Sequence, residues 1–305
     1  MRPQAAACGR FLNKEKKIMK PDELLAALLA FAGENPDVRA VTMEGSRADP
    51  DALHDRYSDI DVCFYVTDAR LFTKNRDWVL RFGDPVIMQC AEDCFKDYDP
   101  ESREPFIFMM QYADESRVDL GIIDIRDIGK QADFDEPRRV LLNKDAFPQL
   151  RDIGDNSVYH VRRPTEKEYF DCCNEFRWVS VYITKGLCRR QLYYAKHHFD
   201  VTCMRQLVRM LSWHAAAGRD FRVSVGGSAK YLEKHLDPAL FIRFRRSFPN
   251  GEYEDIWQKL FVMYDLFADA ARSLADRLGY FFDEAESGRV RAFLEKRKRD
   301  YLSEK

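Results

Sequence analysis

The stretch that decides the fold is MEGSRADPDALHDRYSDIDVCFYV, which occupies residues 43–66 of a 305-residue chain. A β-branched run ends at Gly45-Ser46, and a second run, in which polar and apolar residues alternate, opens with Asp59-Ile60-Asp61. Residues two apart in a strand point to the same face, so Asp59 and Asp61 project side by side. Two carboxylates held this close repel each other, and a hard divalent cation relieves that repulsion. The pattern therefore predicts a metal site at the start of this strand.

A third carboxylate lies on a later stretch with strand character, in the triplet Val118-Asp119-Leu120. Its apolar neighbours predict a buried strand that pairs close to the first two aspartates. We expect Asp119 to join Asp59 and Asp61 as a metal ligand and as a catalytic residue. Metal ions neutralise a triphosphate, and a carboxylate takes the proton from an attacking hydroxyl, so this set favours phosphoryl-type transfer.

The turn that follows the first strand is suited to phosphate. Gly45 allows backbone N–H groups to approach a phosphate, and the Ser46 hydroxyl adds a donor. The planar fork of Arg47 can cap phosphate oxygens. A DxD pair alone is common on solvated strands, and glycine-serine turns are commoner still. The specific signal is their combination with a later apolar-Asp-apolar strand.

Two regions differ in periodicity. Before residue 133, helical spacing at residues 21–31 and 69–82 alternates with strand patterns, which predicts a mixed sheet with helices. From about residue 165 the period is almost entirely helical. The strand patterns cover residues 38–43, 59–66, 86–90, 106–112 and 117–125, and the later helical patterns cover residues 166–194, 201–217, 229–234, 253–278 and 288–301.

The predicted fold class is therefore α+β, with an N-terminal sheet domain followed by a C-terminal helical bundle. Residues 133–164 carry three prolines and little periodicity, and we interpret them as the connection. The expected divisions are a flexible extension over residues 1–19, a sheet domain over residues 20–155 and a helical domain over residues 156–305. Met19 is an alternative start of the chain.

Composition excludes several classes of function. Charged residues make up 33% of the chain but the net charge is −2, which gives no field to attract nucleic acid. No apolar run is long enough to span a membrane, and the N-terminus lacks the apolar core of a secretory signal. The eight cysteines form no CxxC pair, so we expect reduced thiols in a cytoplasmic protein and no structural zinc. The oligomeric state is not predicted.

The pattern of Gly45-Ser46, Asp59-Ile60-Asp61 and Asp119 resembles the polymerase-β-like nucleotidyltransferase superfamily. The surrounding sequence resembles one branch of it, the aminoglycoside 6-adenylyltransferases that inactivate streptomycin. The likeness runs from about residue 20 to about residue 280, through both domains. Its segments are MEGSRADPDA (43–52), YSDIDVCFYV (57–66), WVLRFGDPVIMQ (78–89), RVDLGII (117–123), PTEKEYFDCCNEFRWVSVYITKGLCR (164–189) and VSVGGSAKYLEKHL (223–236).

This resemblance implies an enzyme that uses ATP and Mg²⁺, expected as two ions, with the active site between the domains. Asp59 and Asp61 would bind the metals, and Asp119 would act as ligand, general base or both. Ser46 and Arg47 would hold the triphosphate. The chain departs from the branch at Arg177, where an aromatic residue is expected. It also departs at Gly227-Ser228-Ala229, which is poor in side chains that reach phosphate.

The helix expected from residue 166 has two faces at 100° per residue. One stripe is mostly apolar and belongs in a core: Tyr169, Cys173, Phe176, Ser180, Ile183 and Leu187. The opposite stripe would bind the cationic drug through its carboxylates and aromatic rings, with an amine for phosphate: Asp171, Glu175, Trp178, Tyr182 and Lys185. A solvated face is the alternative. Lys230 is a second candidate phosphate ligand, or an ordinary lysine at a helix start.

These observations together predict Mg²⁺-dependent transfer of AMP from ATP to an aminoglycoside hydroxyl, with the 6-hydroxyl of streptomycin as the first candidate. One alternative keeps the chemistry but uses a hydroxyl of a protein, an RNA or another small molecule. The other is a non-catalytic, antitoxin-like nucleotidyltransferase fold. The presence of all three carboxylates with the Gly-Ser turn disfavours the last, and the absence of a basic stripe disfavours RNA.

Overall fold

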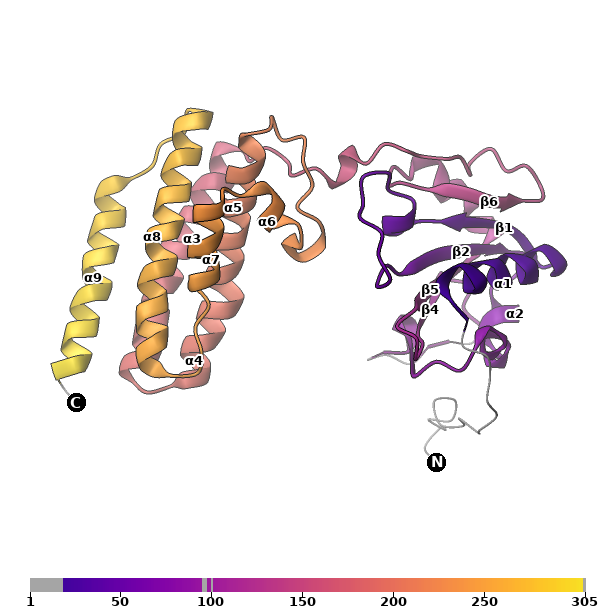
Figure 1. Ribbon diagram of the computed structural model, residues 1–305, viewed down its shortest axis with the longest axis horizontal. Coiled ribbons are helices and arrows are strands. Elements are labelled where there is room, and N and C mark those ends of the chain that lie inside the picture. Colours follow the sequence, from indigo (N-terminus) through magenta and orange to yellow (C-terminus); the bar gives the residue numbers. More distant parts are fainter. Residues whose placement is uncertain (1–18, 95–97, 100, 304–305) are drawn as a thin grey trace. The chain divides into compact units, whose positions relative to one another are not determined.

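The computed structural model describes residues 19–94, 98–99 and 101–303, and the chain divides into two compact units, Met1–Val158 and Tyr159–Lys305 (Figure 1). The first unit contains the sheet and the second is helical. Residues 1–18 of the expected N-terminal extension lie outside the described part. Each unit is considered by itself below.

The first unit is built on one mixed sheet with the strand order β3-β4-β5-β2-β1-β6. The two central strands, β2 and β5, run parallel, and their other neighbours are antiparallel. The strands are β1 (Val38–Met43), β2 (Ile60–Val66), β3 (Ile87–Cys90), β4 (Phe106–Gln111), β5 (Arg117–Asp124) and β6 (Arg139–Asn143). The predicted mixed sheet followed by a helical domain is therefore confirmed.

Strand β6 was not expected, because it falls within the segment interpreted as a connection. It pairs with β1 at the edge of the sheet, where none of its residues is fully buried. An edge strand that is exposed along one side needs no regular apolar alternation, so its sequence gives a weak signal.

One face of the sheet is covered by α1 (Pro21–Glu34) and α2 (Arg70–Thr73). Leu24 and Leu28 of α1 are buried against Val62 and Phe64 of β2. The single helix expected over residues 69–82 was wrong. The chain forms α2 and then a 3₁₀ segment, Asp77–Phe82, whose Trp78 indole donates to the carbonyl oxygen of Phe72 at 2.8 Å.

The opposite face of the sheet carries a smaller apolar cluster around Ala40, Tyr65 and Leu150. Since side chains alternate along a strand, Tyr65 and Cys63 share this face with Asp61. Asp61 therefore lies on the face that α1 and α2 do not cover, and it is partly buried there.

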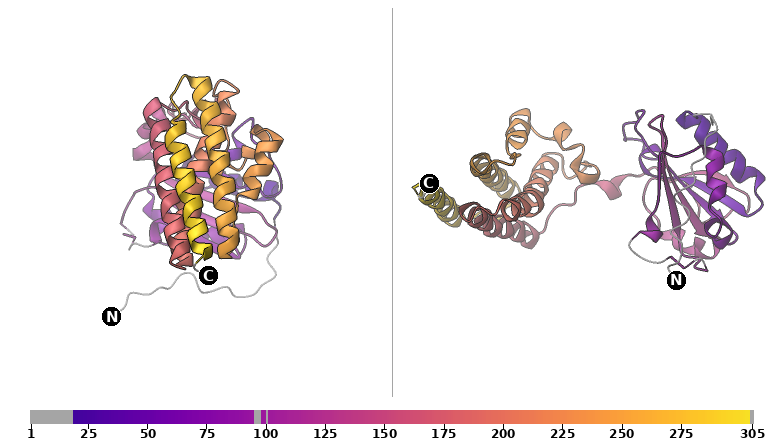
Figure 2. Two further views of the ribbon diagram at one scale, coloured as in Figure 1. Left: turned by 90° about the vertical axis from the view of Figure 1, so that its left-hand side faces the viewer. Right: turned by 90° about the horizontal axis from the view of Figure 1, so that it is seen from below.

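The longer helices of the second unit lie side by side (Figure 2), and they enclose one apolar core. The helices are α3 (Glu166–Cys188), α4 (Leu192–His197), α5 (Met204–Ala217), α6 (Leu232–His235), α7 (Pro238–Arg246), α8 (Tyr253–Leu278) and α9 (Glu284–Ser303). A π-helical turn, His198–Cys203, joins α4 to α5. Helix α7 was not expected; it begins with Pro238 after the N-cap Asp237, whose side chain accepts from the backbone of Ala239 at 2.8 Å.

Helix α3 begins with a capping box in which Thr165 and Glu168 satisfy each other's backbone N–H groups at 3.1 and 2.8 Å. The expected continuous helix over residues 166–194 breaks after α3, where Arg190 takes a φ of 55°. The helix expected over residues 229–234 is a 3₁₀ turn, Gly227–Ala229, followed by the short α6. None of the helices in the described part is long and apolar enough to cross a bilayer.

Candidate active site

The site is organised by the parallel pairing of β2 and β5. In this register Asp61 lies directly opposite Asp119, and Ile60 lies opposite Val118. Adjacent strands run about 4.8 Å apart and paired residues point to the same face. The two carboxylates that sequence reasoning selected from distant segments are therefore nearest neighbours. Asp59 precedes β2 by one residue.

Arg117 completes this group, and sequence reasoning missed it. Its Nε donates to Oδ1 of Asp119 at 2.9 Å and its Nη2 donates to Oδ2 at 2.6 Å. Its Nη1 lies 3.6 Å from Oδ2 of Asp59. The guanidinium thus connects two of the three predicted metal ligands. The available signal was position, because a residue two before Asp119 in a strand shares its face.

The environment of Asp61 raises the pKa of its carboxyl to about 6. Burial is the largest cause, followed by the negative charges of Asp119 and Asp59, and Arg117 opposes the shift. Across the part of the chain that the structure describes, no three His, Cys, Asp or Glu side chains stand in ligating geometry. The carboxylates are close neighbours, but Asp119 is turned to the guanidinium.

Gly45 is required by the position of Asp61. Its φ is +62°, and a Cβ built on it would lie 2.1 Å from Oδ2 of Asp61. Any side chain here would displace the carboxylate, besides straining the backbone. The Glu44 N–H also donates to the carbonyl oxygen of Asp61 at 2.9 Å. The 3₁₀ turn Gly45–Arg47, which includes Ser46, is thereby held against the acidic end of β2.

Arg47, expected to cap phosphate, contacts the backbone in this structure. Its Nε donates to the carbonyl oxygen of Asp59 at 3.0 Å, and its Nη2 donates to that of Ser58 at 3.4 Å. The side chain therefore fixes the segment that leads into β2. Its role toward phosphate stays a prediction.

Comparison with known proteins identifies the family. The model of the family described as streptomycin adenylyltransferase matches residues 19–297. The chain belongs to the streptomycin adenylyltransferase family. It is 31% identical over 267 residues to the aminoglycoside 6-adenylyltransferase of Bacillus subtilis, with 87% of this chain and 94% of that protein covered. It is 30% identical to the enzyme of the same name from Staphylococcus aureus, with 80% and 87% covered. A crystal structure of the Bacillus subtilis protein aligns with a TM-score of 0.46 at 27% identity, covering 92% and 99%.

As a member of the streptomycin adenylyltransferase family, the chain is a nucleotidyltransferase. The carboxylates, the Gly-Ser turn and the mixed sheet are thus parts of an enzyme of that class. The individual roles assigned to Asp59, Asp61 and Asp119 remain predictions.

An ion pair between the buried Arg138 and Glu44 lies next to the Gly45–Arg47 turn of this nucleotidyltransferase. The Arg138 side chain is fully buried, and its Nε lies 3.6 Å from Oε1 of Glu44. Its Nη2 donates to Oε1 of Gln131 at 2.6 Å, and the guanidinium lies 3.9 Å from the ring centroid of Phe134. Glu44 also accepts from the hydroxyl of Thr42 at 3.1 Å. Sequence reasoning missed this pair because Arg138 falls in the segment interpreted as a connection.

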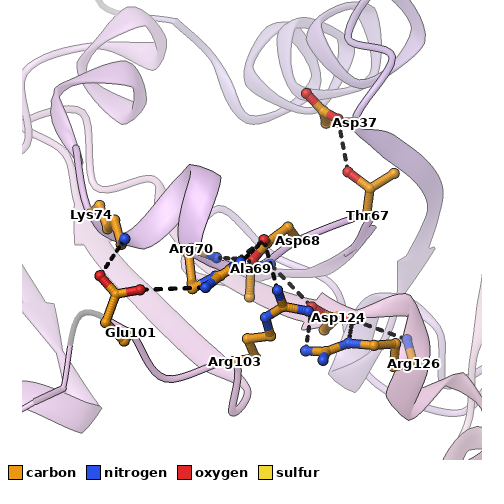
Figure 3. A network of polar contacts seen from close by, with 10 residues as sticks. All are labelled: Asp37, Thr67, Asp68, Ala69, Arg70, Lys74, Glu101, Arg103, Asp124 and Arg126. Carbon is orange, nitrogen blue, oxygen red and sulfur yellow. Dashed lines mark hydrogen bonds and ion pairs between the residues drawn. The ribbon is translucent and has the colours of Figure 1, made fainter.

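The far ends of β2 and β5 are held by a polar network (Figure 3). Asp124, opposite Val66 in the register, is fully buried and accepts from Nε of Arg126 at 2.7 Å. Its other oxygen accepts from the backbone of Ala69 at 3.4 Å. Hydrogen bonds with Arg126 and Ala69 hold the pKa of Asp124 below its usual value despite burial. The contact between Asp124 and Ala69 joins the end of β5 to the segment that follows β2.

The residues predicted on helix α3 fall on one buried face and one more exposed face, as the helical period requires. The apolar stripe is confirmed, because all its members are buried: Tyr169, Cys173, Phe176, Ser180, Ile183 and Leu187. On the other stripe Trp178 is 61% exposed, and its indole donates to the hydroxyl of Tyr182 at 2.9 Å. Glu175 and Lys185 are partly exposed, and the exposed Asp171 pairs with Lys167 at 2.5 Å. The role of this stripe toward a ligand stays a prediction.

The two departures from the family pattern have different structural settings. Arg177 is 6% exposed and donates to Glu286 at 3.1 Å and to the carbonyl oxygen of Asp283 at 3.5 Å. It therefore connects α3 to the start of α9. The second departure, Gly227-Ser228-Ala229, forms a 3₁₀ turn in which Ser228 takes a φ of 52°. Lys230, the candidate phosphate ligand that follows this turn, is exposed, with its Nζ 5.2 Å from the ring centroid of Tyr231. The expected location of the active site between the domains stays a prediction.

Proposed function

We propose that this nucleotidyltransferase transfers AMP from ATP to a hydroxyl of an aminoglycoside, with the 6-hydroxyl of streptomycin as the first candidate. The observation that carries the proposal is the register of β2 and β5, which sets Asp61 opposite Asp119 beside Asp59. The names of its relatives, aminoglycoside 6-adenylyltransferases, support the acceptor. ATP and the proposed reduced state of the thiols both fit a cytoplasmic enzyme.

The donor set fits Mg²⁺. Asp59, Asp61 and Asp119 offer only carboxylate oxygens, which this hard cation prefers. Burial, followed by the negative charges of Asp119 and Asp59, raises the pKa of Asp61 to about 6, and a divalent cation would relieve the repulsion between these carboxylates. When bound, Mg²⁺, proposed as two ions, would neutralise the triphosphate and assist departure of pyrophosphate.

The chain's own groups perform the remaining steps. Asp119 accepts the proton of the drug hydroxyl, and the hydroxyl oxygen attacks the α-phosphorus of ATP. A new P–O bond forms as the bond to the β-phosphate oxygen breaks, and pyrophosphate leaves. Gly45 keeps the turn free of a side chain, so that the backbone N–H groups and the hydroxyl of Ser46 can approach the triphosphate. Arg47 would join them on releasing the backbone.

The helical unit is proposed to bind the drug and the outer phosphates. Asp171 and Glu175 pair with guanidinium or ammonium groups, and Trp178 and Tyr182 offer ring faces to cations and sugars. The Trp178–Tyr182 hydrogen bond orients this aromatic pair without covering it, since Trp178 is 61% exposed. The amines proposed to reach phosphate are those of Lys185 and Lys230.

The test is mass spectrometry of streptomycin and a panel of other aminoglycosides after incubation with enzyme, ATP and Mg²⁺. We expect one AMP adduct on streptomycin and pyrophosphate in equal amount, and neither with Asp119→Asn. AMP on a protein with no drug adduct would overturn the acceptor. Absence of pyrophosphate with every acceptor would overturn the catalytic assignment and favour a non-catalytic fold.

A further inference from the structure

The Arg117 guanidinium lies against carboxylate oxygens that the proposed metal would bind. Its guanidinium engages both carboxylate oxygens of Asp119, at 2.9 and 2.6 Å, and lies 3.6 Å from Asp59. The bidentate arginine takes one lone pair on each oxygen of the carboxylate, which has about four in all, and places a positive charge against both oxygens. The guanidinium therefore competes with a divalent ion for Asp119, because it occupies part of the carboxylate's binding capacity and repels a second cation.

The charges of the group explain why an arginine occupies this position. Three carboxylates share one face at the ends of two adjacent strands, and Arg117 balances part of their charge. Without a cation their repulsion would disfavour the paired register of β2 and β5. The guanidinium is thus a built-in counterion for the metal-free protein.

The same side chain is able to move. Arg117 opens β5, its side chain is 38% exposed, and its carboxylate partners are 36% exposed at Asp59 and 21% at Asp119. Because the pair is partly exposed, water and a divalent cation are able to reach the carboxylate oxygens and compete with the guanidinium for them. Once released, a planar guanidinium beside the carboxylates matches the oxygens of a triphosphate.

We propose that Arg117 exchanges partners during the catalytic cycle: it holds Asp119 and Asp59 before the metal binds, is displaced by the divalent cation, and then binds the triphosphate. This inference rests on the proposed function for the presence of metal and ATP. It adds a positioning residue that couples occupation of the metal site to capture of the nucleotide.

The experiment measures Mn²⁺ binding without nucleotide by electron paramagnetic resonance titration, and then binding of a non-hydrolysable ATP analogue with Mg²⁺. Arg117→Gln should bind Mn²⁺ about threefold to tenfold more tightly than the wild type, as expected for loss of a half-exposed competitor. It should bind the analogue at least tenfold more weakly, because the phosphate ligand is gone. Arg39→Gln is the matched control, since Arg39 makes a similar, partly exposed pair with Asp145, with its Nε 2.8 Å from Oδ2, at the Val38–Val66 end of the sheet.

Arg117→Lys separates displacement from a general effect of charge. Lysine keeps the charge but lacks the bidentate fork, so its Mn²⁺ affinity should fall between those of Arg117→Gln and the wild type. If Arg117→Lys bound Mn²⁺ with the affinity of the wild type, only the positive charge of Arg117 would matter, and the proposed exchange of partners would be overturned. Unchanged analogue binding in Arg117→Gln would remove the phosphate role. A wild type that binds no Mn²⁺ and adenylylates no drug would instead overturn the proposed function.

Discussion

Replacement of Asp61 by asparagine is expected to stabilise the metal-free protein. The pKa of Asp61 is raised from its ordinary value of 3.8 to about 6, chiefly by burial and by the neighbouring carboxylates. That interval corresponds to about 3 kcal/mol of unfavourable free energy for the ionised form in the folded state. Asparagine keeps the shape of the side chain and removes the charge. Most substitutions destabilise, so a gain here would be diagnostic.

The gain has a defined dependence on pH. Because the pKa is higher in the folded state, the folded protein is favoured below pH 3.8, and this advantage is lost as the pH rises through about 6. The difference between Asp61→Asn and the wild type should therefore be small at pH 4 and approach about 3 kcal/mol at pH 7.5.

Hydrogen exchange of the β2 amides, read by mass spectrometry in EDTA and corrected for intrinsic rates, measures the unfolding free energy of this unit. Asp124→Asn is the matched control, and the opposite change in stability is expected for it, because hydrogen bonds lower the pKa of Asp124. That variant should be destabilised at neutral pH by about 1–3 kcal/mol, and less so as the pH falls. A loss of stability in Asp61→Asn at pH 7.5, or a difference independent of pH, would refute the reasoning.

Three further variants test other parts of the molecule. Gly45→Ala places a Cβ 2.1 Å from the carboxylate of Asp61 and should lower kcat/KM at least a hundredfold in steady-state assays, whereas near-normal activity would show that the turn adapts. Trp178→Ala should raise the KM for the aminoglycoside about tenfold with little change in kcat, and an unchanged KM would remove the exposed indole from the drug site. Arg177→Leu leaves Glu286 without its partner, and urea denaturation should show the helical unit less stable by about 1–3 kcal/mol; equal stability would contradict a structural role.

The elements that carry the acidic residues could be predicted because their signals are local. Alternation over residues 59–66 and the apolar flanks of Asp119 defined two strands without knowledge of the rest of the chain. The register that sets Asp61 opposite Asp119 is a long-range property, and neither strand encodes it alone. Arg117 was missed for a related reason, since its importance depends on which strand lies beside it.

The errors in secondary structure also have tertiary causes. Strand β6 is stabilised by pairing with β1, not by an apolar pattern of its own. The break after α3 carries no proline or glycine at the turn itself. The break is explained by the packing of α4 on Gly186, where a Cβ would lie 2.9 Å from the backbone nitrogen of Ala195. Such a contact becomes visible only when both helices are in place.

The most direct test of the central claim, that three carboxylates hold divalent cations for nucleotidyl transfer, is anomalous diffraction. Crystals grown with Mn²⁺ and a non-hydrolysable ATP analogue would be measured at a wavelength where manganese scatters anomalously. We predict a peak bounded by Asp59, Asp61 and Asp119, next to the triphosphate, with Arg117 turned from Asp119 to the phosphates. A triphosphate bound with its manganese away from these carboxylates, or Arg117 still paired with Asp119 beside the nucleotide, would contradict it.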